Sequence, residues 1–337
     1  MSRRAYMFFK KNGLRLLVLR VLLELIWAYI GFLNKRRLAT IAKQTGKSIV
    51  KEVNGSKMRF DFSVDDGLCR FMSLTDIREA YILEALVREV REGNTVVDIG
   101  ANVGYYALLE AKLVGDSGIV YAIEPVPETI ELLRQNIELN KYTNIKTYQQ
   151  AIGNKTGIAS MYVAEWLNRS QMKDLNNTHI NTVSREINVP VSTLDEFLED
   201  KKFPDLIRMD VEGYEYNIFK GMKKILEAEY PLKICMEFHF RWLGIEKSLK
   251  LLRTLKNTGF EIAVATYEID ENCITTSKTL ENIASYLNSK CHRLPPKGYL
   301  KISIADIISN AVVRGNKQGA FDLCMTLGAL EVLFKRT

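Results

Sequence analysis

Cysteine is sparse in this chain of 337 residues. The five cysteines are odd in number, lie far apart and never form a C-x-x-C pair; they are Cys69, Cys235, Cys273, Cys291 and Cys324. A disulfide framework needs paired cysteines and a structural zinc site needs closely spaced ligands, so the pattern argues against both. We therefore expect a reducing compartment and a cytoplasmic protein.

The chain also lacks an uncharged apolar run of membrane-spanning length. Its most apolar segment, residues 14–33, is interrupted by three charged side chains, Arg15, Arg20 and Glu24. A spanning helix needs about 20 mostly apolar residues, and the apolar core of a signal peptide should be uncharged. The flanking basic residues and the Trp27/Tyr29 pair fit a helix lying on anionic lipid, which predicts a peripheral site at the inner face of the membrane. Packing of this helix on the folded body or on a second subunit is the open alternative.

A broad excess of basic charge is missing from most of the chain. The formal net charge is +7, but residues 1–37 hold nine basic side chains against Glu24 alone, so this segment carries +8 and the remainder −1. A protein that binds a phosphate backbone is expected to present a wide basic face. The composition therefore argues against a nucleic-acid partner. At 47% apolar residues, the chain can bury one large α/β core with extensions.

Residues 94–124 contain the most informative pattern, which reads as strand, glycine turn, helix and strand. The β-branched run 95–99 leads into a D-x-G-x-N-x-G turn formed by Asp98, Gly100, Asn102 and Gly104. A helix is expected to follow from residue 105, and the second strand ends at Glu124. An acid at this point can accept hydrogen bonds from both hydroxyls of a ribose. The pattern predicts an adenosine-cofactor site on a doubly wound α/β sheet.

The turn does not have the G-x-G-x-x-G spacing that seats a pyrophosphate, so a dinucleotide is disfavoured. A carboxylate such as Asp98, at the end of the first strand, suits a cationic ligand without phosphate. The amino group of S-adenosylmethionine needs such a partner, and methyl transfer is the leading interpretation. The alternative is that any doubly wound protein can carry a glycine-rich first turn and an acid after its second strand.

The pattern divides the chain into four regions. They are an N-terminal helix (1–47), an entry hairpin around Asn54-Gly55 with a helix (48–93), a catalytic domain (94–270) and a mostly helical extension (271–337). In the catalytic domain we expect further helices and strands, with helices at 127–140, 214–226 and 248–258 and strands at 145–152, 205–211, 232–238 and 260–267. The polar stretch 165–188 is expected to be a loop covering the acceptor pocket. Helices are expected at 302–313 and 319–334.

Five motifs occur in order along the chain: VVDIGANVGYYALL, IEPVPETIELLRQNIELN, VSTLDEFL, LIRMDVEGYEYNIFKG and MEFH. With these motifs the chain resembles, over roughly residues 48–267, the FkbM family of S-adenosylmethionine-dependent methyltransferases. The resemblance implies a class I methyltransferase sheet, which is Rossmann-like, and O-methylation of a hydroxyl on a sugar, glycolipid or other small-molecule acceptor. The family usually has lysine where this chain has Arg208, a change that keeps the charge.

The motif match also implies roles for the cofactor-binding residues. Glu124 is expected at the ribose and the Gln150/Ala151 strand end at the adenine. The methionine portion is expected to be surrounded by the turn residues Asp98, Gly100, Asn102 and Gly104.

The expected catalytic residues are His239, Asp210 and Glu212, which follow the fifth and fourth strands, where open α/β sheets bind ligands. An imidazole needs little tuning to accept a proton near neutral pH, so His239 is expected to be the general base, with Glu212 or Asp210 orienting it or binding the acceptor. A structural histidine after a strand is the alternative. Asp210, Glu212 and Glu237 form an oxygen-rich cluster that could hold Mg²⁺, but the spacing is not diagnostic and no metal is assigned.

Two other functions remain open at this point. One is a membrane-associated scaffold that keeps a cofactor fold without catalysis, which the intact Asp98, Glu124, Asp210 and His239 argue against. The other is RNA methylation. Enzymes that methylate flipped-out bases stack the base on an N-P-P-[YF] motif after the fourth strand, and this chain has none. The sequence predicts no oligomeric state.

Overall fold

The computed structural model describes residues 48–62, 69, 72, 79–164, 170–172, 183–268, 297–299 and 330–336. The predicted N-terminal helix 14–33 and the predicted helix 302–313 lie outside these residues. Among the helices that are described, none combines the length and apolar character needed to cross a bilayer.

The core of the fold is an eight-stranded sheet with the order β13-β12-β14-β11-β10-β3-β4-β5. Its five parallel strands are β11 (Lys233–Phe238), β10 (Leu206–Met209), β3 (Thr95–Ile99), β4 (Ile119–Ile123) and β5 (Ile145–Tyr148). The antiparallel strands are β14 (Leu330–Arg336), β12 (Phe260–Glu268) and β13 (Lys297–Tyr299). The predicted α/β fold with a mostly parallel sheet is therefore confirmed.

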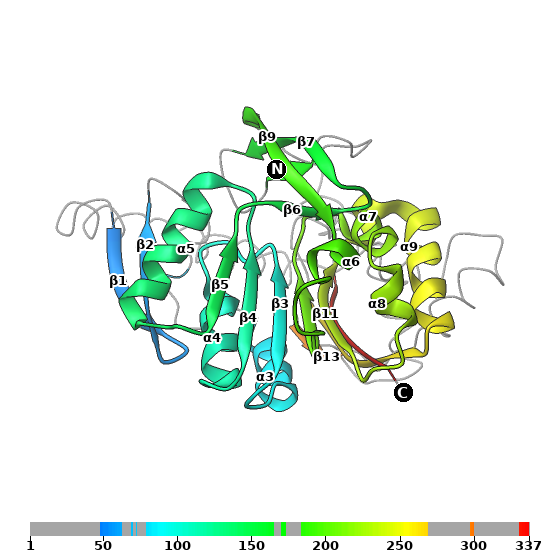
Figure 1. The fold of residues 1–337 in the computed structure, drawn as a ribbon, viewed down its shortest axis with the longest axis horizontal. Helices are drawn as coiled ribbons and strands as arrows, with labels where there is room; N and C mark the ends of the chain where they lie inside the picture. Colours follow the sequence, from blue (N-terminus) through cyan, green and yellow to red (C-terminus); the bar gives the residue numbers. More distant parts are fainter. Residues whose placement is uncertain are drawn as a thin grey trace, which may run out of the picture.

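Helices cover both faces of this sheet (Figure 1). One face packs against α3 (Ala80–Glu89), α4 (Tyr105–Val114) and α5 (Pro127–Asn140). The other packs against α6 (Leu194–Phe197), α7 (Glu215–Lys220), α8 (Lys223–Glu227) and α9 (Phe240–Asn257). Successive strand residues point to opposite faces, so Val96 belongs to the first apolar core and Val97 to the second. Every residue of β3 and β10 is buried, as expected for strands covered on both sides.

A hairpin of β1 (Ser48–Val53) and β2 (Ser56–Asp61) packs beside α5. Its turn residues Asn54 and Gly55 have φ values of 51° and 75°, which confirms the predicted hairpin turn. Two asparagines of α5 accept hydrogen bonds from the backbone of β2: Asn136 from Arg59 N at 2.7 Å and Asn140 from Lys57 N at 2.7 Å. These bonds attach the hairpin to the central domain.

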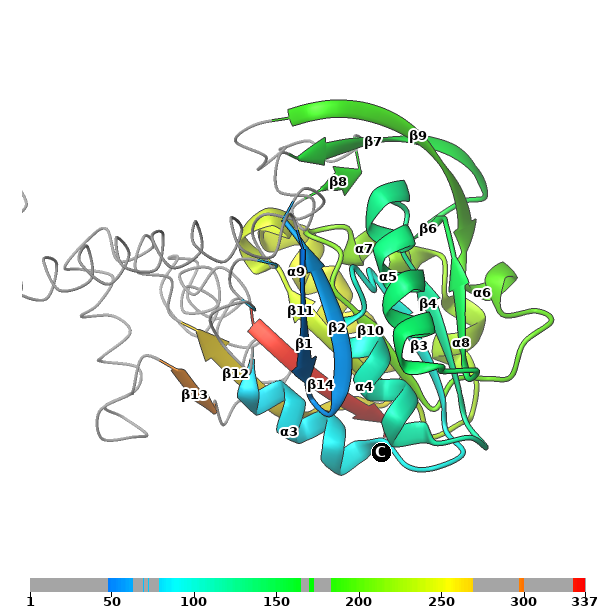
Figure 2. The ribbon, with the colours of Figure 1, turned by 90° about the vertical axis from the view of Figure 1, so that its left-hand side faces the viewer.

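A second sheet, with the order β6-β9-β7-β8, arches over the ends of the central strands (Figure 2). Its strands are β6 (Ala151–Gly153), β9 (Val183–Thr193), β7 (Gly157–Ala164) and β8 (Gln171–Met172). Two expectations are corrected here. The predicted strand 145–152 divides between the two sheets as β5 and β6, and the predicted loop 165–188 contains β8 and the start of β9. Residues 185, 186 and 188 are exposed, so this part of β9 needs few apolar side chains and gives little hydrophobic signal.

The predicted helix 319–334 is wrong at its end, because residues 330–336 form β14 between β11 and β12. The short apolar run Val332–Phe334 is fully buried, and such a run does not distinguish a buried strand from a buried helix by its periodicity. The predicted helix 214–226 is divided into α7 and α8. The predicted helix 248–258 begins earlier, at Phe240, and bends at Gly244, whose φ is 73°.

Candidate active site

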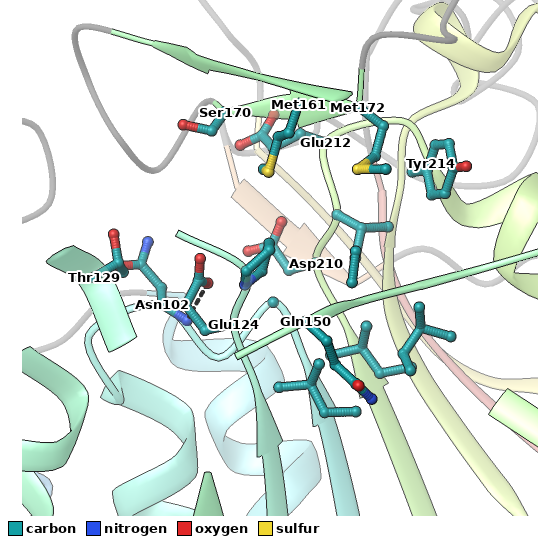
Figure 3. Close-up of a pocket in the computed structure, with 17 residues that line it drawn as sticks. Asn102, Glu124, Thr129, Gln150, Met161, Ser170, Met172, Asp210, Glu212 and Tyr214 are labelled. Atoms are coloured by element: carbon teal, nitrogen blue, oxygen red, sulfur yellow. Dashed lines mark hydrogen bonds between the residues drawn. The ribbon is translucent and has the colours of Figure 1, made fainter. Parts of the chain in front are cut away.

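A pocket lies at the carboxyl ends of β3, β4 and β10, beneath the second sheet (Figure 3). Its floor comes from the turn after β3 and from the ends of β4 and β5. Its roof comes from the second sheet through Met161, Ser170 and Met172. Glu212 and Tyr214 lie at the level of the roof, and Asp210 lies between roof and floor. Five of the seven predicted cofactor residues line this pocket: Gly100, Asn102, Glu124, Gln150 and Ala151.

The turn after β3 has no space for a side chain at Gly100. Its φ is 82°, and a Cβ atom there would overlap the carbonyl oxygen of Asp210. The loop therefore lies directly against the end of β10. Gly104 opens α4 with a φ of 98°, and a Cβ there would be 2.7 Å from Leu133 Cδ1 on α5. Both glycines are required by close packing, and Gly104 is not part of the pocket lining.

Glu124 is a buried carboxylate held by the backbone. Its Oε2 accepts a hydrogen bond from Asn102 N at 3.0 Å and its Oε1 accepts one from Val126 N at 2.9 Å. Burial raises the pKa of Glu124 to about 7, against the opposing effect of these two bonds. On the same side of the pocket, Gln150 Nε2 donates a hydrogen bond to Ser192 Oγ at 3.1 Å, which ties the end of β5 to β9.

Asp98 lies near the end of β3, where it is fully buried and is not part of the pocket lining. Its Oδ1 lies 3.0 Å from Arg208 Nη1, and Arg208 Nη2 lies 3.5 Å from Asp210 Oδ2. The guanidinium also stacks on Tyr106, 3.7 Å from the ring centroid. Burial raises the pKa of Asp98, and the Arg208 charge only partly offsets this.

The Oδ1 atom of Asp98 is thus engaged by Arg208, and pairing of Asp98 with the amino group of a ligand stays a prediction. Asp210 instead presents its carboxylate to the pocket. The sequence alone does not predict this ion pair, because the pair depends on the strand register, in which Arg208 lies directly opposite Asp98.

His239 lies between the end of β11 and the start of α9, with only 3% of its surface exposed. Its Nδ1 lies 2.5 Å from Glu215 Oε1, a buried residue of α7. Its Nε2 lies 3.5 Å from Glu237 Oε1 and 3.8 Å from Glu212 Oε2. The ring of Trp242 stacks on the imidazole with a centroid separation of 4.4 Å.

The surroundings of His239 bear on its expected role. Burial alone would lower its pKa, but the charges of Glu237, Glu215 and Glu212 outweigh burial and hold the pKa well above its ordinary value. A raised pKa favours the protonated imidazole, which cannot accept a proton until it loses its own, so the role of His239 as general base stays a prediction. Glu215, which follows Glu212 by three residues and fixes the ring, was not among the predicted site residues.

Asp210 and Glu212 both line the pocket, with side chains 19% and 17% exposed. Glu212 adopts a left-handed backbone conformation with a φ of 51°. Its carbonyl oxygen accepts a hydrogen bond from Gln171 Nε2 of β8 at 3.1 Å, which joins the second sheet to this loop. One ligand atom each from Asp210, Glu212 and His239 lie within 4.8 Å of one another. The structure thus brings the three predicted catalytic residues together.

Comparison with known proteins identifies related sequences. Residues 98–262 match the family model described as the methyltransferase FkbM domain. The hexuronic acid methyltransferase AglP of Haloferax volcanii is 27% identical over 195 residues, which cover 56% of this chain and 75% of AglP. A protein-L-isoaspartate O-methyltransferase of Methanothrix thermoacetophila is 44% identical over 57 residues, which cover 17% of this chain and 27% of that protein.

The chain thus spans about a quarter of the length of the isoaspartate methyltransferase that it matches. Among solved structures, a SAM-dependent O-methyltransferase from Thermotoga maritima aligns with a TM-score of 0.39 and 13% identity. The alignment covers 87% of this chain and 78% of that one.

Proposed function

Because residues 98–262 belong to the methyltransferase FkbM family, we propose that this protein transfers the methyl group of S-adenosylmethionine to a hydroxyl oxygen of a sugar-containing acceptor. The observation that carries the proposal is the pocket between the two sheets. It combines the glycine turn, the buried Glu124 and the Asp210/Glu212 pair in one space.

The floor of the pocket suits the nucleoside part of the cofactor. Glu124 offers carboxylate oxygens to the two ribose hydroxyls. Apolar side chains on both sides of the pocket offer surfaces for a flat base; they are Ile123, Ile152, Met161 and Met172. Gln150 and Ala151 also line the pocket, and the proposal assigns them to the adenine.

Asp210 and Glu212 line the same pocket, and the proposal assigns them to the acceptor. Methyl transfer is an in-line displacement in which the acceptor oxygen forms a bond to the methyl carbon while the carbon–sulfur bond breaks. The products are the methylated acceptor and S-adenosylhomocysteine. Either carboxylate can orient the acceptor hydroxyl and take its proton as the new bond forms. Arg208, held by Asp98, fixes Asp210 in this position.

The sugar class of the acceptor is supported by AglP, whose printed name describes a hexuronic acid methyltransferase. A hydroxyl-bearing glycan also matches the chemistry of the pocket, because paired carboxylates accept hydrogen bonds from neighbouring hydroxyls.

The proposal is tested with S-adenosylmethionine that carries an isotopically labelled methyl group. The full chain is incubated with uronic-acid oligosaccharides, with matched neutral oligosaccharides and with protein substrates, and labelled products are identified by mass spectrometry. Mild alkali then separates the two possible products. The labelled methyl group of an ether stays on the sugar, whereas that of an ester is released by hydrolysis. Cofactor binding without any labelled sugar would refute the acceptor class, and absence of cofactor binding would refute methyl transfer.

The Asp210→Asn variant tests the acceptor side of the proposal. We expect turnover to fall about a hundredfold or more while the affinity for S-adenosylmethionine changes no more than about threefold. The control is Glu246→Gln, an exposed carboxylate that pairs with Lys250 on α9. Unchanged turnover in the Asp210 variant would remove this residue from the mechanism.

A further inference from the structure

We propose that Asp210, Glu212 and His239 form a binding site for a divalent transition-metal ion, with Mn²⁺ preferred over Mg²⁺, on the acceptor side of the pocket. The inference deepens the proposed function, because an ion here would hold the acceptor hydroxyl. Binding of the ion itself is measured without any acceptor.

The three side chains meet the distance requirement for a shared ion. Their ligand atoms lie within 4.8 Å of one another. Ligand atoms about 2.1 Å from one ion are separated by about 3 Å when adjacent and by about 4.2 Å when opposite. Small side-chain rotations therefore suffice to bring the three atoms to a single ion. The carboxylates are partly exposed, so an ion can reach them from the pocket.

His239 provides the second line of support, because its two ring nitrogens have different surroundings. Nδ1 is held by the buried Glu215 at 2.5 Å. Nε2 faces Glu212 and Glu237 at 3.8 Å and 3.5 Å, which is longer than the usual range of about 2.7–3.2 Å for a hydrogen bond from nitrogen. A metal-binding histidine commonly gives one nitrogen to the metal, in place of the proton on that nitrogen, and the other to a carboxylate that orients the ring. Glu215 has that orienting position.

The ligand types decide which ion is expected. The sequence suggested an all-oxygen Mg²⁺ site with Glu237, but the three mutually close ligand atoms come from Asp210, Glu212 and His239. Imidazole suits transition metals, whereas Mg²⁺ prefers oxygen ligands and its own waters. Mn²⁺ accepts both carboxylate and imidazole. The position beside Asp210 and Glu212, both in the pocket lining, lets a bound ion reach two neighbouring hydroxyls of a sugar.

The test uses the full chain after chelator treatment and dialysis. Free Mn²⁺ is measured by electron paramagnetic resonance during a titration, and electron spin echo envelope modulation reports nitrogen bound to the ion. We expect one saturable Mn²⁺ site with a nitrogen signal, and Mg²⁺ binding at least about tenfold weaker. The variants His239→Gln and Asp210→Asn should each weaken Mn²⁺ binding at least about tenfold, and the histidine variant should lose the nitrogen signal. Glu246→Gln serves as the matched control.

Circular dichroism establishes that each variant is folded, and calorimetry with S-adenosylhomocysteine is run on the same samples. No saturable Mn²⁺ binding by folded wild-type protein overturns the site, as does a nitrogen signal that persists in His239→Gln. Cofactor binding without Mn²⁺ binding removes the metal site and leaves the proposed function intact. Mn²⁺ binding with the expected variant losses supports the site even where cofactor binding fails.

Discussion

Glu124 couples the proposed cofactor site to pH through its burial at the end of β4. Its pKa is raised to about 7, so the carboxylate forms only as the pH rises through this value. Ribose hydroxyls donate more strongly to a charged carboxylate than to a neutral one. We therefore expect the affinity for S-adenosylmethionine to increase with pH through about 7.

The Glu124→Gln variant should lose this pH dependence and bind S-adenosylmethionine about tenfold more weakly at high pH, as measured by calorimetry across a pH series. Glu128→Gln is the control, because Glu128 is a half-exposed carboxylate on the neighbouring α5 that pairs with Arg185. An identical pH slope in wild type and Glu124→Gln would contradict the assigned role.

Glu110 is a second buried carboxyl, and it affects stability. Both of its oxygens are buried without a hydrogen-bond partner, and burial raises its pKa well above the ordinary value. The pKa of Glu110 is thus higher in the folded protein than in the unfolded chain. Its contribution to the free energy of unfolding is therefore fully present below the unfolded-state pKa and is lost as the pH rises toward the folded-state pKa.

Glutamine does not titrate, so the free energy of unfolding of Glu110→Gln should rise relative to that of wild type as the pH increases. At neutral pH the variant should be more stable than wild type by at least about 1 kcal/mol. Urea unfolding at several pH values measures the difference. Parallel stability curves for the two proteins would show that Glu110 does not titrate as the structure indicates.

At the scale of elements, the C-terminal strand β14 completes the central sheet. It pairs with β11 on one side and β12 on the other, and Phe334 is 1% exposed. We expect Phe334→Ala to lower the free energy of unfolding by about 3–5 kcal/mol, because it leaves a cavity in the core. Chemical denaturation measures the change. The control Ile158→Ala, at a side chain 78% exposed on β7, should stay within about 0.5 kcal/mol of wild type. A loss below about 1 kcal/mol for Phe334→Ala would show that β14 is not an integral strand.

Helices and strands could be predicted from the sequence where the pattern that identifies them lies within their own residues. The segment from β3 to α5 combines a β-branched strand, a glycine turn and two periodic helices, and all of these were found. β14 was missed because its partners β11 and β12 lie far away in the chain and its apolar run is short. The start of β9 was missed because its residues are mostly polar. Within the site, Asp210, Glu212 and His239 could be predicted to lie close together, because they follow the carboxyl ends of neighbouring strands. The Asp98–Arg208 pair and the Glu215–His239 contact depend on strand register and helix placement, which spacing alone does not give.

At the scale of the whole molecule, the pocket exists because two sheets meet. The second sheet lies over the ends of the central strands (Figure 2). The central sheet supplies the glycine turn and the carboxylates that line the pocket at its strand ends. The bond from Gln171 to the Glu212 carbonyl and the bond from Gln150 to Ser192 join the two sheets on either side of the pocket. The predicted lipid-binding role of residues 14–33 lies outside the described residues and stays a prediction.

Calorimetric titration of the full chain with S-adenosylmethionine and S-adenosylhomocysteine tests the central claim most directly. The account predicts saturable binding of one molecule of either compound per chain and no comparable binding of NADH. Tight binding of NADH, with no heat from either sulfur compound, would contradict it.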